Sequence, residues 1–385
     1  MKIKKSQARI STSLTITDSD NKPIKGVTVV AFTDFAKKIG DQKKTDSKGK
    51  AIFQLTQKKI EQLYVYPDHS FWGYFKKNIN LSTSPTIKLT SIDLKFTDSL
   101  RHFYDTRNWP KVEKGVRVGI IDTGVGPHGD LQVSGGANVI SGEDPLDFKD
   151  NGEGHGTHVA GIISAFGGLT GLAAGIDIYS YRVFPKGGNA SNFDIMKAVD
   201  KARTDGCDLI NLSLGEPASD EGVMSSIKEA YASGILCFAA NGNDDRSAVN
   251  FPASYSLSIA VSAMGRKGTF PASTVQTATV RAPFGTDSNN FIADFSNVGP
   301  ETDLTAPGVG IISTFPNDLY AIMDGTSMAC PAAVGMAARL LSGQTAILGL
   351  PRNQQRTDEM QKFLATKIRS MGFGANFEGK GMLFP

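Results

Sequence analysis

The sequence of 385 residues has only three cysteines and two tryptophans, and it contains no long apolar run. The cysteines Cys207, Cys237 and Cys330 are odd in number and lie among apolar residues, which predicts buried free thiols and argues against a disulfide framework. No stretch reaches the roughly 18 apolar residues that a membrane helix needs, so no membrane span is expected. No apolar run of signal-peptide length follows the basic segment Met1–Gln7. These features favour a cytoplasmic location, although a secreted protein whose signal peptide had been removed would have the same composition.

The charged residues are distributed unevenly along the chain. Residues 1–98 contain 18 Lys and Arg against 9 Asp and Glu, a net charge of +9, and the other 287 residues contain 23 against 29, a net charge of −6. Opposite net charges indicate separate units that attract each other or bind different partners, so a docking partner for the N-terminal part remains open. A lysine-rich, solvated β surface explains the positive charge equally well. Because no basic cluster is interleaved with aromatic residues, nucleic-acid binding is not expected.

Residues 1–91 are predicted to form a small all-β sandwich. Turn clusters at Asp18–Pro23 and Thr45–Gly49 separate runs rich in β-branched and aromatic residues. The predicted strands are Ser13–Thr17, Val27–Phe32, Ala51–Leu55, Leu63–Tyr66 and Thr86–Leu89. The pattern resembles the transthyretin-like, carboxypeptidase-regulatory type of β-sandwich. Residues 92–115, which end in Trp109-Pro110 and Lys114-Gly115, are predicted to be a connector.

Residues 116–385 have the sequence pattern of an α/β domain. Four apolar runs are suited to strands that are buried on both faces, and helical segments alternate with them. The runs are Val116–Ile121, Ile176–Val183, Asp208–Leu214 and Ile235–Ala240, and the predicted helices are 155–166, 192–205 and 221–233. This alternation predicts a mostly parallel sheet flanked by helices, with an active site beyond the carboxyl ends of its strands.

Three glycine-rich segments contain the parts of one catalytic site. Val118–Gly124 includes Asp122, His155–Gly161 begins with a histidine, and Gly325–Ala329 includes Ser327. A serine is a poor nucleophile unless a base lies beside it and a third group orients that base. Ser327 should lie at the start of a helix, whose positive end favours developing negative charge, with Pro331 in the first turn. A fourth segment, Ala239–Asn243, directly follows an apolar run.

The order acid, histidine, serine, together with these four segments, resembles the subtilisin family of serine peptidases. The resemblance implies an endopeptidase in which His155 is the general base, Asp122 orients it and Ser327 is the nucleophile. Asn243 would donate its side-chain amide to the oxyanion, beside the backbone N–H of Ser327. His158 would face the core. Asp122-Thr123-Gly124 also spells the aspartic-peptidase signature, but that chemistry needs two carboxylates and no second copy of the signature exists.

The same resemblance assigns residues that bind the substrate. Ser213, Leu214 and Gly215 form an edge that pairs with the substrate backbone, and Gly187-Gly188 supply the opposing edge, so the peptide would add as a strand. Asn250 would lie at the base of the pocket for the residue before the scissile bond. A neutral amide there predicts medium or large uncharged side chains.

The sequence departs from the family in two loops. Only nine residues, 162–170, follow the histidine segment before Gly171, so the loop that usually carries the strong calcium site is missing. No metal or other cofactor is therefore predicted, although acidic residues such as Asp147, Asp150, Asp244 and Asp245 could form another calcium site. Between Met264 and Phe295 the chain has about 20 extra residues, and long loops in compact domains are often functional. The role of this 265–294 insertion cannot be read from the sequence.

The prediction from the sequence is therefore a serine endopeptidase acting on polypeptides. Two alternatives remain open. One is a catalytically restrained member of the family that works as a binding protein through its sandwich. The other is a peptide ligase or macrocyclase that uses the same acyl-enzyme, because the partition between water and an amine depends on access to the site.

Overall fold

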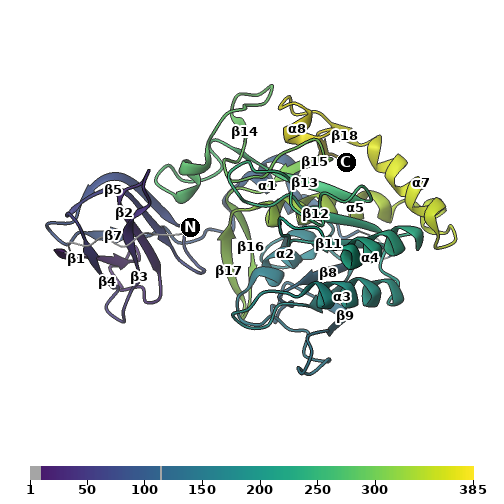
Figure 1. The fold of residues 1–385 in the computed structure, drawn as a ribbon, viewed down its shortest axis with the longest axis horizontal. Helices are drawn as coiled ribbons and strands as arrows, with labels where there is room; N and C mark the ends of the chain where they lie inside the picture. Colours follow the sequence, from purple (N-terminus) through teal and green to yellow (C-terminus); the bar gives the residue numbers. More distant parts are fainter. Residues whose placement is uncertain (1–9, 113–114) are drawn as a thin grey trace. The chain divides into compact units, whose positions relative to one another are not determined.

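The computed structural model describes residues 10–112 and 115–385. The basic segment Met1–Gln7 and Lys114, at the end of the predicted connector, lie outside the described residues. The chain divides into two compact units (Figure 1). Unit 1 consists of Met1–Phe96 together with Phe270–Thr279, and unit 2 consists of Thr97–Thr269 together with Val280–Pro385. The chain therefore passes from unit 2 into unit 1 and back within the 265–294 insertion.

Unit 1 contains two β-sheets, which confirms the predicted all-β region. A three-stranded sheet has the order β4 (Lys50–Leu55), β1 (Ile10–Thr17), β7 (Thr86–Lys88), and a four-stranded sheet has the order β3 (Ile39–Lys44), β2 (Thr28–Asp34), β5 (Lys59–Tyr66), β6 (Tyr74–Asn80). Along β4, Ala51, Phe53 and Leu55 are buried and alternate with exposed residues, as a strand with one face on a core requires. They pack with Leu14 of β1 and Leu63 of β5 into one apolar cluster.

Unit 2 is built on an eight-stranded sheet that is parallel except for β14, which confirms the predicted fold class. The strand order is β14-β13-β12-β11-β8-β10-β9, and β15 also pairs with β13. Their bounds are β8 Arg117–Asp122, β9 Val133–Asn138, β10 Asp177–Arg182, β11 Leu209–Leu212, β12 Leu236–Ala240, β13 Ser258–Arg266, β14 Asn290–Ile292 and β15 Leu304–Pro307. Every residue of β11 and β12 is buried, because helices cover both faces of the sheet.

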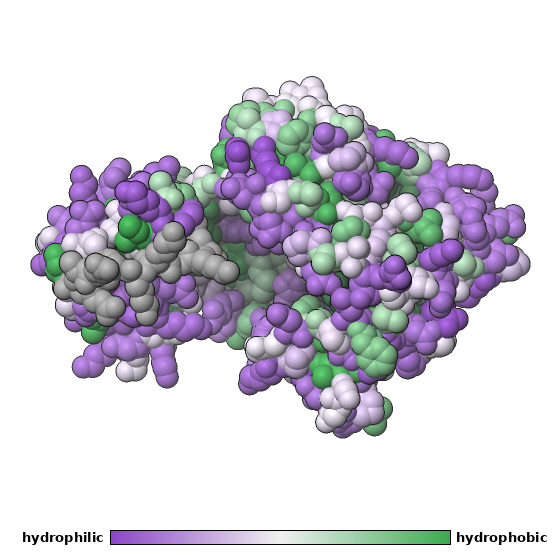
Figure 2. All heavy atoms as spheres, in the orientation of Figure 1, coloured by the Kyte–Doolittle hydropathy of each residue, from purple (hydrophilic) through white to green (hydrophobic). Residues whose placement is uncertain are grey.

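Four helices flank this sheet, and two pairs of them pack together, α2 with α5 and α3 with α4 (Figure 1). Their bounds are α2 His155–Ser164, α3 Asn192–Thr204, α4 Glu221–Ala232 and α5 Thr326–Ser342. The smaller elements are α1 Ser99–Tyr104, η1 Thr106–Asn108, η2 Val275–Thr279, β16 Ile311–Phe315, β17 Leu319–Met323, α6 Thr345–Leu348, α7 Gln354–Ala365, β18 Ile368–Arg369, α8 Ala375–Glu378 and β19 Met382–Leu383. Among the described residues, no helix is both long and apolar enough to span a membrane. Hydrophilic residues predominate on the face drawn in Figure 2, with hydrophobic residues scattered among them. All three cysteines are buried and free, as predicted.

One prediction about α5 is wrong. Pro331 does not lie in the first turn but inside the helix, which begins at Thr326. Since proline has no N–H, the carbonyl of Ser327, four residues earlier, loses its helical partner. That carbonyl accepts a hydrogen bond from the Ser213 hydroxyl at 2.9 Å instead. The interruption of the helix is therefore compensated by a side chain from another loop.

Part of the predicted connector is built into unit 2. Asp98 caps α1 by accepting the N–H of Arg101 at 2.9 Å, and its second oxygen accepts the N–H of Ile312 at 2.9 Å. The Arg101 guanidinium lies 2.5 Å from the same oxygen, and both side chains are almost fully buried. Tyr104 extends the attachment by donating to the carbonyl of Leu383 at 2.9 Å. Residues 98–104 are thus an integral part of unit 2.

We expect the buried pair of Asp98 and Arg101 to be important for stability. Arg101→Ala leaves a buried carboxylate without its charge partner, so the free energy of unfolding should fall by about 3–5 kcal/mol. Arg107→Ala is the matched control, because it removes an exposed pair with Asp105 and should cost at most about 1 kcal/mol. Urea unfolding followed by circular dichroism measures both variants. Equal losses in the two variants would contradict the assigned role of the buried pair.

Candidate active site

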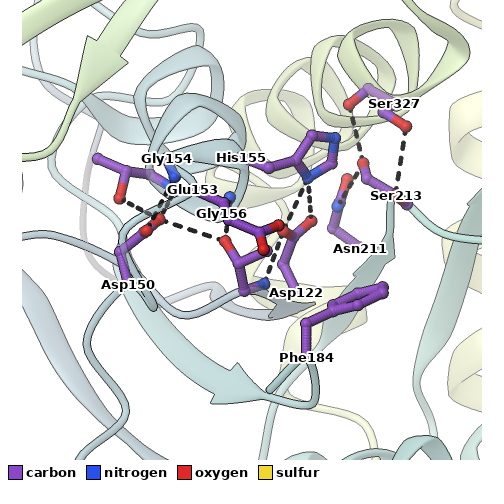
Figure 3. A network of polar contacts seen from close by, with 12 residues as sticks. Asp122, Asp150, Glu153, Gly154, His155, Gly156, Phe184, Asn211, Ser213 and Ser327 are labelled. Atoms are coloured by element: carbon purple, nitrogen blue, oxygen red, sulfur yellow. Dashed lines mark hydrogen bonds and ion pairs between the residues drawn. The ribbon is translucent and has the colours of Figure 1, made fainter. Parts of the chain in front are cut away.

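The candidate residues lie on loops and helix starts at one edge of the parallel sheet. Asp122 is the last residue of β8, Ser213 directly follows β11, and Asn243 follows β12 by three residues. His155 is the first residue of α2, and Ser327 is the second residue of α5. Because the carboxyl ends of parallel strands meet at one edge, residues far apart in sequence come together there (Figure 3).

Asp122 and His155 form a hydrogen-bonded pair. The Nδ1 atom of His155 lies 2.8 Å and 2.9 Å from the two carboxylate oxygens of Asp122. The Asp122 side chain is fully buried, whereas 30% of the His155 side chain is exposed. Burial lowers the pKa of His155, but the charge of Asp122 and its hydrogen bond raise it by more, so the pKa lies above the ordinary histidine value. The opposite edge of the ring is turned toward Ser327 (Figure 3).

Asp150 fixes the start of α2, a role that the sequence analysis missed. Gly154, the residue before the helix, has a φ of 80° and supplies no side-chain cap. Asp150 replaces the cap: one carboxylate oxygen accepts the N–H of Gly154 at 2.9 Å, and the other accepts the Thr157 hydroxyl at 2.9 Å. The Thr123 hydroxyl donates to that second oxygen at 3.2 Å, which links the loop after β8 to the helix that begins at His155. Burial raises the pKa of Asp150. The Asp-x-Gly-x-Gly spacing before the histidine is the signal that points to this turn.

Ser327 and Ser213 form two reciprocal hydrogen bonds. The Ser327 hydroxyl donates to the carbonyl of Ser213 at 3.2 Å, and the Ser213 hydroxyl donates to the carbonyl of Ser327 at 2.9 Å. In the part of the chain that the structure describes, no hydrogen bond joins the Ser327 hydroxyl to His155. Such bonds often form only in the substrate complex.

Asn243 is held with its amide nitrogen available to a ligand. Its Oδ1 atom accepts the backbone N–H of Thr326 at 2.9 Å and the Thr326 hydroxyl at 3.1 Å. Since the oxygen is engaged by the start of α5, the Nδ2 end is directed to the side of Gly325 and Ser327. The first N–H groups of α5 add the positive end of a helix at the same place.

A cavity of about 320 Å³ lies beside Ser327 and Asn243. Three of the predicted substrate-binding residues line it, Leu214, Gly215 and Asn250. Ser213 contacts Ser327 directly.

Gly188 and Asp244 differ in their position relative to this cavity. Gly188 is not among the residues that line this cavity, and it lies in a turn in which its N–H bonds to the carbonyl of Pro185 at 3.1 Å. Asp244, which the analysis of the pocket missed, does line the cavity, and its Oδ2 atom accepts the Asn250 amide at 3.0 Å. A carboxylate therefore accompanies the expected neutral amide in this pocket.

His158 lies away from this chemistry. It is fully buried, and its Nε2 atom lies 3.1 Å from the carbonyl of Ile311. Burial lowers its pKa to about 3, so the ring is neutral in the core. Its position agrees with the expectation that it faces the core.

The residues around the shortened 162–170 loop do not fit a calcium ion. Asp130 faces this loop, and its two oxygens accept the N–H groups of Gly168 at 2.8 Å and Leu169 at 3.0 Å. The Tyr320 hydroxyl donates to it as well, at 2.8 Å. Calcium needs a set of oxygen ligands, whereas hydrogen-bond donors occupy the carboxylate here. The loop is therefore closed by a carboxylate that binds amides.

The other acidic residues considered for a cation are engaged elsewhere. Asp147 pairs with Arg182 at 3.4 Å, and Asp245 pairs with Arg281 at 2.9 Å. Across residues 10–112 and 115–385, no group of three or more His, Cys, Asp or Glu side chains is placed to hold a metal ion.

Comparisons with known proteins agree with this arrangement. A family model described as "Subtilase family" matches residues 113–379. Subtilisin DY of Bacillus licheniformis is 38% identical over 235 residues, which cover 59% of this chain and 77% of that protein. Alkaline elastase YaB of a Bacillus strain is 38% identical over 227 residues, 58% of this chain and 53% of that protein. Thermostable alkaline protease of Halalkalibacterium halodurans is 32% identical over 292 residues, 75% of this chain and 71% of that protein.

We expect stability to be insensitive to removal of calcium. The melting temperature should change little when EDTA is added, because Asp130 and the amides of Gly168 and Leu169 close the loop without a cation. Asp130→Ala should lower the free energy of unfolding by about 1–3 kcal/mol, because the amide of the buried Leu169 loses its partner, whereas the exposed amide of Gly168 can bond to water. Calorimetry with EDTA and with excess calcium measures the first effect. A large fall in melting temperature with EDTA, restored by calcium, would show that a calcium site exists.

Proposed function

The chain belongs to the subtilase family and is a serine endopeptidase, and from this premise we propose that it hydrolyses peptide bonds through an acyl-enzyme on Ser327. The observation that carries this proposal is the hydrogen-bonded pair of Asp122 and His155, whose imidazole is turned toward Ser327 at the start of α5. Activation of a serine requires a base that a third group orients, and Asp122 with His155 would supply those two parts to Ser327.

In the proposed reaction, the Ser327 Oγ atom attacks the carbonyl carbon of the substrate while His155 takes its proton at Nε2. Asp122 accepts the Nδ1–H of the ring and stabilises the imidazolium that forms. The tetrahedral intermediate collapses when the C–N bond breaks, and His155 gives the proton to the leaving amine. A water molecule, deprotonated by the same histidine, then attacks the acyl-enzyme. The bond from the acyl carbon to Ser327 Oγ breaks, His155 returns the proton to that oxygen, and the acid leaves.

Asn243 is proposed to stabilise the negative oxygen of the tetrahedral intermediate. Support comes from its fixed orientation, since Thr326 binds its oxygen and leaves the amide N–H groups for the substrate. The backbone N–H of Ser327 would be the second donor. These dipoles are in place before the charge develops, so little reorganisation is required during the reaction.

The substrate is proposed to bind as an extended strand along Ser213–Gly215, with the side chain before the scissile bond in the cavity. Asn250 favours medium or large uncharged side chains there. Asp244 binds the amides of Asn250 and Asn297 through one oxygen. Its other oxygen makes no hydrogen bond within the described residues. The pocket could therefore also bind a positively charged substrate side chain through this oxygen. The Gly187-Gly188 edge stays a prediction.

We propose that the β-sandwich is a persistent accessory domain. Its own apolar core, with Leu14, Phe53 and Leu63, supports independent folding of the strands. A peptidase segment, Phe270–Thr279, is part of the same unit, and residues 98–104 are built into unit 2. Both features disfavour clean removal of the sandwich. The docking partner of the sandwich stays a prediction. The similarity to subtilisins does not support the cytoplasmic location and is consistent with the alternative, a secreted protein.

The catalytic roles can be tested by substitution. Ser327→Ala and His155→Ala should each abolish hydrolysis of a peptide p-nitroanilide to a similar degree, because they act as one unit. Asn243→Ala should lower kcat by about 10²–10³ with KM nearly unchanged, a magnitude known from a subtilisin itself. If the His155→Ala variant cleaved peptides normally, the assignment would be wrong. Mass spectrometry of the products, in the presence of an added amine, separates hydrolysis from ligation, and a wild type that a fluorophosphonate does not label would point to a binding protein.

The pH dependence tests the coupling of Asp122 to His155. Only the neutral imidazole accepts a proton, so kcat/KM should rise with pH and reach half its maximum above the ordinary histidine pKa. In Asp122→Asn the largest raising charge is gone while burial remains, so the midpoint should move to lower pH. Asp144→Asn, an exposed carboxylate outside the site, is the control and should leave the midpoint in place. An unchanged midpoint in Asp122→Asn would contradict the electrostatic role.

A further inference from the structure

The 265–294 insertion has a tip in unit 1, where it packs against the sandwich strands. Val275 belongs to a buried cluster with Val30, Phe32 and Tyr64. The carbonyl of Ser273 accepts the backbone N–H of Phe75, in the edge strand β6, at 2.9 Å. An edge strand has unpaired backbone groups, and this contact satisfies one of them. The tip is thus anchored by both apolar packing and a backbone hydrogen bond.

The returning part of the insertion, in unit 2, binds the loop that carries Asn243. We call residues 241–246 the oxyanion loop. Arg246 donates from Nη2 to the carbonyl of Ile292 at 2.9 Å and from Nη1 to the carbonyl of Ala282. Arg281 pairs with Asp245 at 2.9 Å. Two consecutive residues of the oxyanion loop are therefore bound by side-chain contacts to the returning segment.

The residues just after the insertion hold the loop on both sides of Asn243. The backbone N–H of Asn297 donates to the carbonyl of Gly242 at 2.9 Å, and the Asn297 side chain receives the N–H of Asp244 at 2.8 Å. The N–H of Asp245 donates to the carbonyl of Phe295 at 3.2 Å.

The conformation of this loop also requires support from outside. Asp245 and Arg246 have φ values of 55° and 61°, in the left-handed region that disfavours residues other than glycine. Such a conformation persists only where surrounding contacts impose it. The contacts with residues 281–297 hold Asp245 and Arg246 in this conformation.

We propose that residues 265–297 act as a strut that positions the oxyanion donor Asn243, and that the tip in unit 1 makes turnover depend on the β-sandwich. This inference rests on the proposed function, since it concerns how the oxyanion donor is held. A hydrogen-bond donor that stabilises a transition state must be positioned precisely, because a misplacement of about 1 Å can lower the rate by about 10²-fold. Arg246 is a positioning residue in this scheme, because it acts through Asn243 and does not touch the substrate.

A double-mutant cycle tests the strut. Arg246→Ala should lower kcat for a peptide p-nitroanilide by about tenfold to a hundredfold with KM nearly unchanged. In the Asn243→Ala background the same change should have little further effect, because the donor that it positions is already gone. Arg246→Lys keeps the charge but not the two-branched guanidinium, so its kcat should lie between those of the wild type and Arg246→Ala. Lys267→Ala is the control and should keep full activity, because the Lys267 ammonium donates to the carbonyl of Ser288 and, among the described residues, makes no hydrogen bond to the oxyanion loop.

A second pair of variants tests the tip. Val275→Asp places a charge in the buried cluster of unit 1 and should lower kcat with KM nearly unchanged. Ala272→Asp adds the same charge to an exposed position of the insertion and should have no effect. Hydrogen exchange of residues 270–279 shows whether the tip is released. Val275→Ala, a milder change, replaces the Asp variant if that variant does not fold.

The outcomes separate this inference from the proposed function. A wild type that a fluorophosphonate does not label at Ser327 would overturn the proposed function itself. If the wild type is labelled, equal effects of Arg246→Ala in the presence and absence of the Asn243 side chain would overturn the strut. A released tip with unchanged kcat would overturn the dependence on the sandwich.

Discussion

The buried carboxylate of Asp122 is the constraint on which the candidate site depends. A charge without solvent must be compensated by hydrogen bonds, and here the ring of His155 and the N–H of Thr123 provide them. The bond to the ring fixes the imidazole and, together with the charge of Asp122, raises the pKa of His155. Asp150 then attaches the neighbouring loop to α2, so the position of the histidine is set by two carboxylates with different roles. One carboxylate orients the base, and the other orients the helix from which the base projects.

A second theme is that interruptions of regular structure are compensated by distant side chains. Pro331 removes a helical hydrogen bond inside α5, and Ser213 takes the free carbonyl, which also brings Ser213 against Ser327. Asp130 closes the shortened loop by binding its amides. These compensations place polar groups where the chemistry needs them, because the site lies where strands and helices end.

The sequence predicted those parts of the fold whose signal is local. Apolar runs such as Ile235–Ala240 gave the buried strands, and the predicted helices 155–166, 192–205 and 221–233 differ from the observed ones by two residues or fewer at each end. Strands β3 and β6 were missed because lysine and asparagine interrupt them, and pairing with β2 and β5 determines their structure. Pro331 was misplaced because the first residue of α5 was not known. The contact of Asp244 with Asn297 and the contacts of Arg246 depend on residues far away in sequence, which no local pattern reveals.

The central claim is that Ser327, His155 and Asn243 act on one substrate carbonyl. A crystal structure of the protein after reaction with a peptidyl phosphonate tests it most directly, because the adduct carries a negative oxygen where the tetrahedral intermediate would carry one. The account predicts a covalent bond to Ser327 Oγ, with that oxygen within hydrogen-bond distance of Asn243 Nδ2 and of the backbone N–H of Ser327. A phosphonate bonded to another residue, or an adduct oxygen turned away from Asn243, would contradict it.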